Sequence, residues 1–193
     1  MYRGENCRPD LLYLRFVRIE RMRREEGKLK ELRELLGELC VPEARIGCAV
    51  GEELLQLDGE GMPCPETAFA RALFGDYRIY AYVPEPLTGQ MTGDLIASLD
   101  DMAQILGYRV PLRSRDELRG RFCAYLLKGE GILALGRTPK ETATAVRMVK
   151  KALRVEIAGR RLGGTRHLSP VLCALEHLVY RKKYSRNEVQ ADS

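Results

Sequence analysis

Hydrophobic residues recur along the chain with two different periods, and each period predicts a different kind of element. Apolar residues spaced three or four apart, as on one face of a helix, run through residues 10–40, and residues 95–106 are also predicted to be helical. Apolar and polar positions alternate through 78–83 and predict a strand there, and a further strand is predicted over 108–112.

Glycine and proline mark the limits of two shorter elements. Residues 54–61 are an apolar run closed by a Gly-rich turn, which predicts a short strand. Residues 65–74 begin with proline and carry Phe69, Leu73 and Phe74 on one side, which predicts a short helix.

The strongest local pattern is a pair of apolar strands around a tight turn. Residues 122–127 and 132–135 are apolar, and the turn between them is Gly129-Glu130-Gly131. Glycine is favoured where the chain reverses sharply, so the sequence predicts a hairpin with Glu130 at its tip.

Two helices are predicted after this hairpin. The first covers 138–162: it begins with a capping box, Thr138-Pro139-Lys140-Glu141, and ends at Gly163-Gly164. The second begins at Ser169-Pro170, and the polar tail after residue 185 (186–193) is expected to fray. The apolar positions of this last helix are Val171, Leu172, Leu175, Leu178 and Val179.

Strands and helices interleave throughout, so the fold class is α/β. A chain of 193 residues fits one domain, 1–193, and can bury about 70% of its unfolded surface. With 45% hydrophobic residues, a packed core is expected. No signal peptide and no apolar stretch of membrane-spanning length is visible, so the sequence predicts a cytoplasmic protein that does not enter membranes.

Charge and cysteine usage exclude several classes of function. The chain has 32 basic and 27 acidic residues, which is not the one-signed charge of a dedicated nucleic-acid binder. The six cysteines form no Cys-x-x-Cys pair, and the two histidines, His167 and His177, are predicted to be surface residues. Cys123 and Cys173 lie in apolar runs and are predicted to be small core residues.

Three segments together carry a resemblance to a known family. They are the hairpin and capped helix from 126 to 164, the segment 99–107 (LDDMAQILG), and the segment 61–69 (GMPCPETAF). Their sequence resembles the class II aldolase and adducin family, in particular its fuculose-phosphate aldolase-like members. The resemblance is best supported over residues 55–170.

The resemblance implies a fold and an assembly. The family has a central, mainly antiparallel sheet flanked by helices, a three-layer αβα arrangement, and typically forms homotetramers with sites between subunits. Its enzymes are aldehyde-lyases that hold Zn²⁺ with three histidines. The metal polarises a carbonyl of a small sugar phosphate or hydroxy-carbonyl substrate and stabilises an enediolate, and a nearby glutamate moves the proton.

Carried over by position, the family's site is largely replaced in this chain. The glutamate position falls on Glu66, and the three histidine positions fall on Tyr82, Pro84 and Glu130. Proline has no side-chain ligand atom and neutral tyrosine is a poor zinc ligand, so no metal is expected there. The segments that cradle the substrate phosphate are also absent between residues 27 and 60, and the substrate-binding residues remain unknown.

Each candidate residue also has a plainer interpretation. Glu66 could be an acid/base residue or simply an acidic residue in the first turn of a helix, where the helix dipole favours it. Tyr82 could be an acid or a packing residue. Glu66, Glu85 and Glu130 could together hold a divalent metal ion such as Mg²⁺, Mn²⁺ or Ca²⁺, or Glu130 could be an exposed turn residue.

These observations leave three functional hypotheses. The first is a non-catalytic, homo-oligomeric scaffold or a partner of another protein, as in adducins, which keep this fold without the metal site. The second is an aldolase-type lyase with Glu66 as acid/base and a remodelled divalent metal site. The third is polyanion binding by Arg and Lys clusters near the two ends of the chain, although nucleic acid is the least favoured partner.

Overall fold

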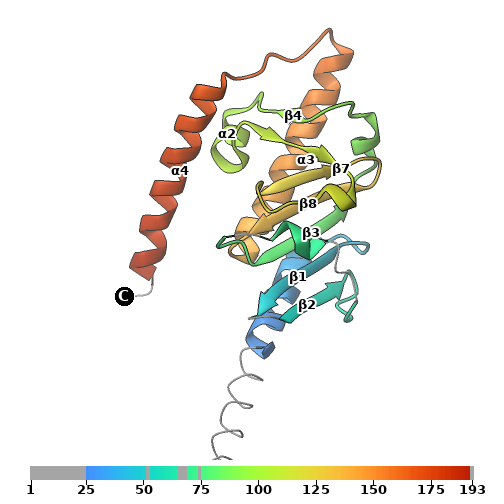
Figure 1. The fold of residues 1–193 in the computed structure, drawn as a ribbon, viewed down its shortest axis with the longest axis vertical. Helices are drawn as coiled ribbons and strands as arrows, with labels where there is room; N and C mark the ends of the chain where they lie inside the picture. Colours follow the sequence, from blue (N-terminus) through green and yellow to red (C-terminus); the bar gives the residue numbers. More distant parts are fainter. Residues whose placement is uncertain (1–24, 51–52, 65–68, 74, 192–193) are drawn as a thin grey trace, which may run out of the picture.

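The computed structural model describes residues 25–50, 53–64, 69–73 and 75–191, with the side chains of 50, 53 and 183–191 left aside (Figure 1). An N-terminal helix is described over 25–39. It matches the later part of the helix predicted for 10–40, and the earlier part lies outside the described residues.

The centre of the fold is a six-stranded sheet in the order β2-β1-β3-β8-β7-β6. Neighbouring strands are antiparallel except β6 and β7, which are parallel. The predicted mainly antiparallel sheet is therefore confirmed. The strands are β1 (Arg45–Val50), β2 (Glu53–Asp58), β3 (Ile79–Pro84), β6 (Leu112–Arg113), β7 (Ala124–Leu127) and β8 (Gly131–Gly136).

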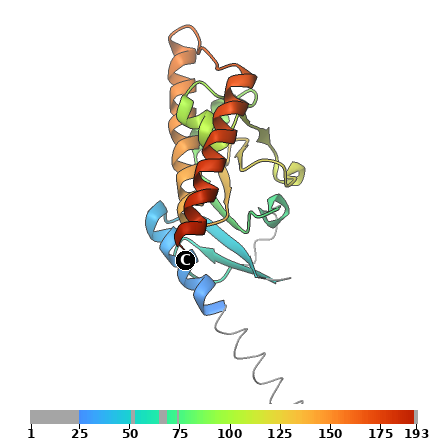
Figure 2. The same ribbon diagram turned by 90° about the vertical axis from the view of Figure 1, so that its left-hand side faces the viewer.

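Helices cover one face of this sheet. The long helix α3 (Pro139–Arg161) packs across β8 and β3, and α2 (Asp100–Leu106) packs between α3 and the last helix, α4 (Pro170–Ala191) (Figures 1 and 2). The other face is covered by short 3₁₀ helices, η1 (Phe69–Ala72) and η3 (Arg115–Glu117), and by the segment that follows η3. The sheet therefore lies between two outer layers, as the αβα prediction requires.

The two faces of the sheet have different cores. The face toward α3 is aliphatic, with Ala81 and Ile132 of the sheet against Val149 and Leu153 of the helix. The opposite face is aromatic and contains Phe69, Tyr80, Tyr82 and Tyr125. Because successive side chains of a strand point to opposite faces, β3 contributes to both cores and is buried along nearly its whole length.

The beginning and end of α3 follow the prediction. The Thr138 hydroxyl accepts a hydrogen bond from the backbone N–H of Glu141 at 3.2 Å, and Pro139 is the first helical residue. The Glu141 carboxylate accepts from the N–H of Arg137 at 2.9 Å, one residue earlier than a reciprocal capping box would require. Gly163, with a φ of +106°, follows the C-cap residue Leu162, and the N–H of Gly164 donates to the carbonyl of Gly159 at 2.8 Å, which closes the helix.

The helix predicted for 95–106 is wrong in its first part. Residues Leu95–Ile96 form strand β4, which pairs with β5 (Arg109–Val110) in a separate two-stranded sheet. The helix begins only at Asp100, because the preceding residues are extended and make cross-strand contacts. The strand predicted for 108–112 is likewise divided between β5 and β6 on either side of Pro111.

Strand β1 is not among the predicted elements, although Ile46, Cys48 and Val50 alternate along it, and the glycine between the first two has a packing role. Gly47 lies in its middle, where a β-carbon would be 2.5 Å from the ring of Tyr80. The glycine therefore makes room for an aromatic ring of the neighbouring strand, and only the packed structure shows this.

Two further predictions concern the ends of elements. Of the helix predicted for 65–74, the described part is η1, a single 3₁₀ turn. The helical backbone of α4 continues to Ala191. The fraying of 186–193 stays a prediction, and so does the single-domain assignment. Among the described residues, no helix has both the length and the apolar character needed to cross a bilayer.

Candidate functional site

The end of β3 and the β7–β8 turn meet at one place. Pro84 pairs with Gly131, and the backbone N–H of Glu85 donates to the carbonyl of Glu130 at 3.2 Å. The Tyr82 hydroxyl donates to the same carbonyl at 3.4 Å. The structure thus brings Tyr82, Pro84 and Glu130 together, whereas Glu66 lies outside the described residues.

Two glycines make this close approach of the chain feasible. Gly129 has a φ of +71°, a conformation that side chains with a β-carbon rarely adopt. At Gly131 a β-carbon would be 2.4 Å from the carbonyl oxygen of Val83. The Gly-Glu-Gly sequence therefore holds Glu130 at the tip of a turn that lies directly against β3.

A cationic side chain occupies the position in front of Glu130. The Arg115 Nε donates to Glu130 Oε2 at 2.5 Å. Its guanidinium carbon lies 5.1 Å from the ring centroid of Phe69 and 5.8 Å from that of Tyr82. The two rings stack at 4.8 Å with an interplanar angle of 18°, so the guanidinium has a carboxylate on one side and aromatic rings on another.

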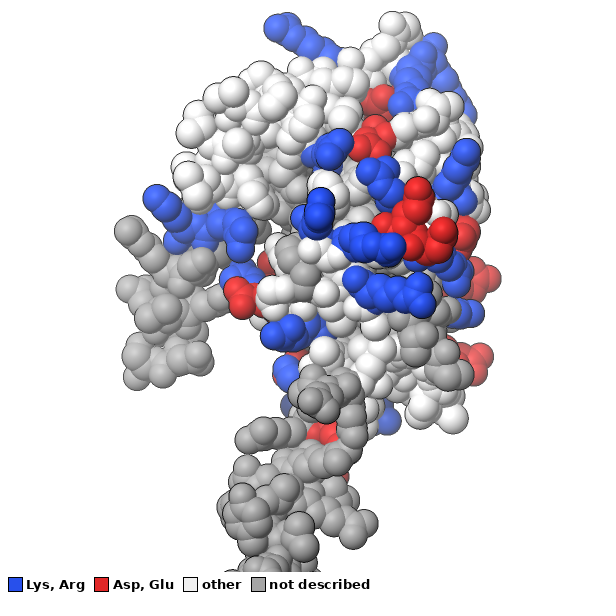
Figure 3. Space-filling model, viewed as in Figure 1, with Lys and Arg blue, Asp and Glu red and all other residues white. Residues whose placement is uncertain are grey.

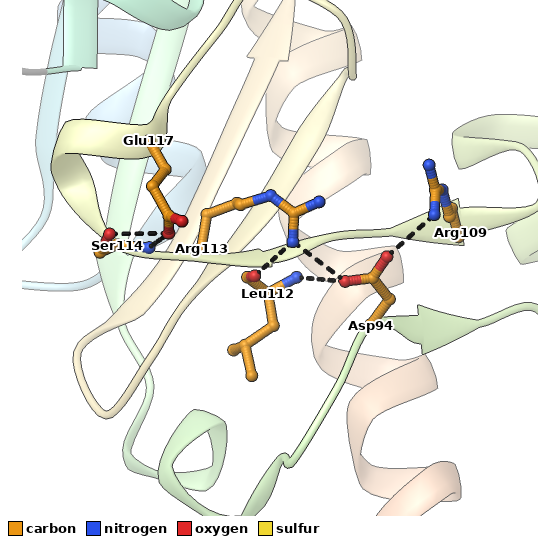
Figure 4. A network of polar contacts seen from close by, with 6 residues as sticks. All are labelled: Asp94, Arg109, Leu112, Arg113, Ser114 and Glu117. Carbon is orange, nitrogen blue, oxygen red and sulfur yellow. Dashed lines mark hydrogen bonds and ion pairs between the residues drawn. The ribbon is translucent and has the colours of Figure 1, made fainter.

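A network of polar contacts positions the segment that carries Arg115 (Figure 4). Ser114 donates to Glu117 Oε2 from its N–H at 2.9 Å and from its hydroxyl at 2.7 Å, which caps η3. In β6, which precedes η3, the N–H of Leu112 donates to the Asp94 carboxylate at 3.0 Å, and the Arg113 guanidinium donates to it at 3.3 Å. These contacts fix β6 and η3, and so direct Arg115 toward Glu130.

The phenol of Tyr82 is a weak acid in this environment. Burial raises its pKa above the ordinary value, Arg115 opposes this, and Glu130 adds to it. The hydroxyl therefore stays protonated at neutral pH and serves as a hydrogen-bond donor. A metal ligand or a ready proton donor would need the opposite shift.

Glu85 has a local structural role. It is 9% exposed, and its Oε1 accepts from the N–H of Leu87 at 3.4 Å at the start of η2 (Pro86–Gln90). Its carbonyl accepts from the Thr88 hydroxyl at 2.8 Å. Within the described part of the chain, no three His, Cys, Asp or Glu side chains are grouped closely enough to hold a metal ion.

The residues that the sequence predicts at the family's ligand positions, Tyr82, Pro84 and Glu130, do not fit a three-histidine zinc centre. Only Glu130 offers an anionic oxygen, and that carboxylate is paired with Arg115. Pro84 offers no side-chain ligand atom, and burial raises the pKa of Tyr82, which favours its neutral form. Their chemistry is that of an internal ion pair beside aromatic rings.

The two histidines bind other elements of the fold. His167 is 39% exposed at its side chain and lies 3.2 Å from Oε2 of the buried Glu156, which also accepts from Arg160 at 2.8 Å. His177 is partly buried, and its Nδ1 lies 2.8 Å from the carbonyl of Gln104 in α2, so Nδ1 carries the proton. His167 is exposed, as the sequence predicts, and His177 lies at the surface with its ring partly buried against α2.

A cavity of about 280 Å³ lies in a different place, between the start of α3 and α4. Tyr77, Cys123 and Tyr180 are among its lining residues. Burial raises the pKa of Cys123 and that of Tyr77 to about 12 each. Burial therefore favours the neutral thiol of Cys123 and the neutral phenol of Tyr77.

Sequence reasoning found the turn but missed its partner. Arg115 stands in a charged segment, 113–121, in which nothing distinguishes it from its neighbours. Phe69 was assigned to a helix face, without any indication that it stacks on Tyr82. Both roles depend on contacts between residues that lie far apart in the sequence.

The comparisons with known proteins agree with this arrangement of the sheet and helices. No protein-family model and no curated protein matches the sequence. Among solved structures, an L-fuculose 1-phosphate aldolase matches with a TM-score of 0.60 at 13% identity, over 81% of this chain and 95% of its own. The L-fuculose 1-phosphate aldolase from Glaciozyma antarctica PI12 matches with a TM-score of 0.60 at 12% identity, over 79% and 82%.

A third match comes from a different protein with the same fold. YgbL from Escherichia coli has a TM-score of 0.58 at 14% identity, over 79% of this chain and 99% of its own. The chain therefore has the class II aldolase-like fold. Within that class, its structure is similar to those of L-fuculose 1-phosphate aldolases, and the resemblance found in the sequence is confirmed at the level of the fold.

Proposed function

We propose that this protein is a class II aldolase-like protein that has lost the zinc site and acts without catalysis, as a homo-oligomeric scaffold or as the partner of another protein. The observation that carries the proposal is the ion pair between Arg115 and Glu130. The guanidinium of Arg115 supplies a positive charge beside Glu130, one of the residues predicted at the family's ligand positions.

The surroundings of the ion pair support the same proposal. A divalent ion placed at Glu130 would be repelled by the guanidinium of Arg115, which the rings of Phe69 and Tyr82 hold in place. Among the side chains predicted at the ligand positions, the other oxygen is that of the Tyr82 phenol, which burial keeps neutral. The fold is kept while the groups needed for metal-assisted aldol chemistry are replaced.

Metal analysis tests the proposal directly. Untagged protein purified without chelators is expected to contain no stoichiometric zinc or manganese and to show no change in melting temperature with Zn²⁺, Mn²⁺ or Mg²⁺. It is also expected not to cleave sugar-phosphate aldol substrates. About one bound metal per chain, or robust aldol cleavage, would overturn the proposal.

A gain-of-site variant tests whether the residue correspondence is right. Tyr82→His, Pro84→His and Glu130→His are combined with Arg115→Ala, which removes the competing charge. If the three positions correspond to the family's ligands, this variant should be stabilised by zinc while the parent chain is not. The matched control carries Arg115→Ala alone, and equal zinc responses of the two variants would show that the correspondence is wrong.

The lyase alternative makes a different prediction. With Glu66 as acid/base, Glu66→Gln should abolish aldol cleavage while leaving the melting temperature nearly unchanged. This alternative also needs Glu130 released from Arg115 and Glu85 released from the start of η2, which makes it the less favoured function.

A further inference from the structure

Helix α4 turns a row of apolar side chains outward. Among the described residues, seven large apolar side chains are exposed, and five of them lie on α4 with exposed fractions of 43–72%. We name these five the α4 stripe. It consists of Val171, Leu172, Leu175, Leu178 and Val179. Figure 3 shows a broad surface without charged side chains over the first half of this helix.

The opposite side of α4 is already occupied. Cys173 is fully buried, and His177 is hydrogen-bonded to the carbonyl of Gln104 in α2. At about 100° per residue the α4 stripe covers about 120° of the helix, and its middle residue, Leu175, points about 160° away from Cys173. The stripe is therefore a second apolar face, separate from the one that attaches α4 to the fold, and contiguous exposed apolar surface of this kind marks an interaction site.

The sequence of the stripe reads the same in both directions about Leu175. Leu172 and Leu178 lie three residues on either side of it, and Val171 and Val179 lie four residues on either side. Both the spacing and the residue types are therefore symmetric. A two-fold interface joins one patch to an identical copy of itself, with each residue i meeting a residue j in both directions. The α4 stripe is self-complementary in this sense.

We propose that the α4 stripe is a two-fold interface that binds a second copy of this chain, through an antiparallel pair of α4 helices centred on Leu175. In this pair each Val171 lies opposite the Val179 of the other copy, and the two Leu175 side chains meet at the axis. The inference supplies a surface for the homo-oligomer of the proposed function and rests on that function in this respect only.

The charges of α4 select the antiparallel direction. The helix is basic after the stripe, at Arg181, Lys182, Lys183 and Arg186, and its only charged residue between 170 and 180 is Glu176. A parallel pair would place the basic end of one helix against that of the other, where like charges repel. In the antiparallel pair the basic ends lie at opposite ends of the interface, and Glu176, about 100° around the helix from Leu175, lies outside the stripe.

The test compares the size of the assembly in two matched variants. Leu175→Glu places two carboxylates together at the axis, whereas Met62→Glu changes a side chain of similar exposure, 59% against 57%, in the turn after β2. Glutamate is a good helix former and position 175 is exposed, so the variant should keep its fold, as far-UV circular dichroism will show. Analytical ultracentrifugation over a concentration series is expected to show a twofold lower mass for Leu175→Glu and the parent mass for Met62→Glu.

Cysteine cross-linking tests the antiparallel register. Packed helices lie 8–10 Å apart, so the two α-carbons at position 175 should be about 5 Å apart, within the range of a disulfide. Leu175→Cys should therefore form a linked dimer on mild oxidation. Val171→Cys alone should not, because its two copies would be about 12 Å apart along the helix, but a mixture of Val171→Cys and Val179→Cys should. The parent chain, with its exposed Cys40, gives the background.

The outcomes separate this inference from the proposed function. An oligomer of unchanged mass in Leu175→Glu would overturn the α4 interface and leave the oligomeric scaffold standing. A parent chain that is monomeric at its highest soluble concentration would overturn both the interface and the oligomer, whatever the metal analysis shows. Linking of Val171→Cys to itself as readily as Leu175→Cys would overturn the antiparallel pair. A monomer that sediments with anionic lipid vesicles through the stripe would assign this face to a membrane surface instead and likewise overturn it.

Discussion

The β7–β8 turn and the outer face of α4 differ in whether their side chains have partners within the chain. At the turn, each strong polar group has a partner in the same chain: Arg115 pairs with Glu130, and Tyr82 donates to a backbone carbonyl. On α4, five large apolar side chains are exposed by 43–72%. The turn is internally satisfied, whereas the helix has surface that a partner could cover.

This contrast indicates where interactions of the protein should be sought. At the turn, the Glu130 carboxylate is already paired with Arg115, whose guanidinium also lies beside the rings of Phe69 and Tyr82. Exposed leucine and valine side chains gain free energy when they leave water, by about 25 cal/mol for each Å² that is buried. The polar groups of the β7–β8 turn are already paired within the chain, whereas α4 exposes apolar side chains to solvent.

The largest expected effect breaks the turn. Gly131→Ala places a methyl group 2.4 Å from the carbonyl oxygen of Val83, so strands β3 and β8 must separate. We expect a loss of about 2–3 kcal/mol in the free energy of unfolding, measured by urea denaturation. Gly93→Ala, where a β-carbon meets no atom within 4 Å, is the control and should change stability by less than about 0.5 kcal/mol. Equal effects of the two substitutions would contradict the close approach at Gly131.

The next effect concerns the connection between α3 and α4, and it depends on pH. Burial raises the pKa of Glu156, but hydrogen bonds led by that of Arg160 outweigh it and lower the pKa below the ordinary value of 4.5. The ionised form is thus favoured by folding. Its contribution is fully present above the unfolded pKa and is lost as pH falls through the lower folded value.

Glu156→Gln tests this assignment. At pH 7 we expect it to lower the free energy of unfolding by about 1.5–3 kcal/mol, because charged hydrogen bonds are lost. The difference from the parent chain should shrink as the pH falls below 4.5. Glu38→Gln, which removes a partly exposed pair with Arg147, should cost less than about 1 kcal/mol. A pH-independent difference for Glu156→Gln would show that the carboxylate charge has no part in stability.

A smaller effect is expected for the ion pair at the turn. A double-mutant cycle of Arg115→Met and Glu130→Gln should give a coupling energy of about 0.5–1 kcal/mol, since both side chains are partly exposed. The more exposed pair of Lys151 and Asp101 provides the comparison and should give less. Zero coupling between Arg115 and Glu130 would mean that the turn does not hold its cation, and the contrast with α4 would weaken.

The smallest effect is expected on α4 itself. Leu175→Glu should change the stability of the isolated chain by less than about 0.5 kcal/mol, because the side chain contributes little to the core of its own copy. Thermal melts at high dilution measure this value. A loss of several kcal/mol would place Leu175 inside the fold rather than on a docking surface.

Much of the fold could be predicted from local signals. The hairpin at 124–136 was predicted because apolar runs on both sides of a Gly-flanked turn form a pattern within a few residues. The start of α3 was predicted because Thr138 and Pro139 have preferences that depend on neighbouring backbone groups. The helix prediction was wrong for the first residues of 95–106, because their apolar pattern fits a helix face as well as a strand. The pairing of Leu95 with Val110 selects the strand.

The sequence by itself determined the kind of residue at each position: no histidine in the β7–β8 turn, an acidic residue at its tip, and a symmetric apolar set on the last helix. These are properties of composition and spacing. Tertiary structure alone decided that Arg115 pairs with Glu130 beside the aromatic rings. It also decided that Gly47 leaves room for the ring of Tyr80, and that the α4 stripe faces away from α2. Such contacts join residues far apart in the chain, so their energies depend on the packing of whole elements, which no local pattern of residues specifies.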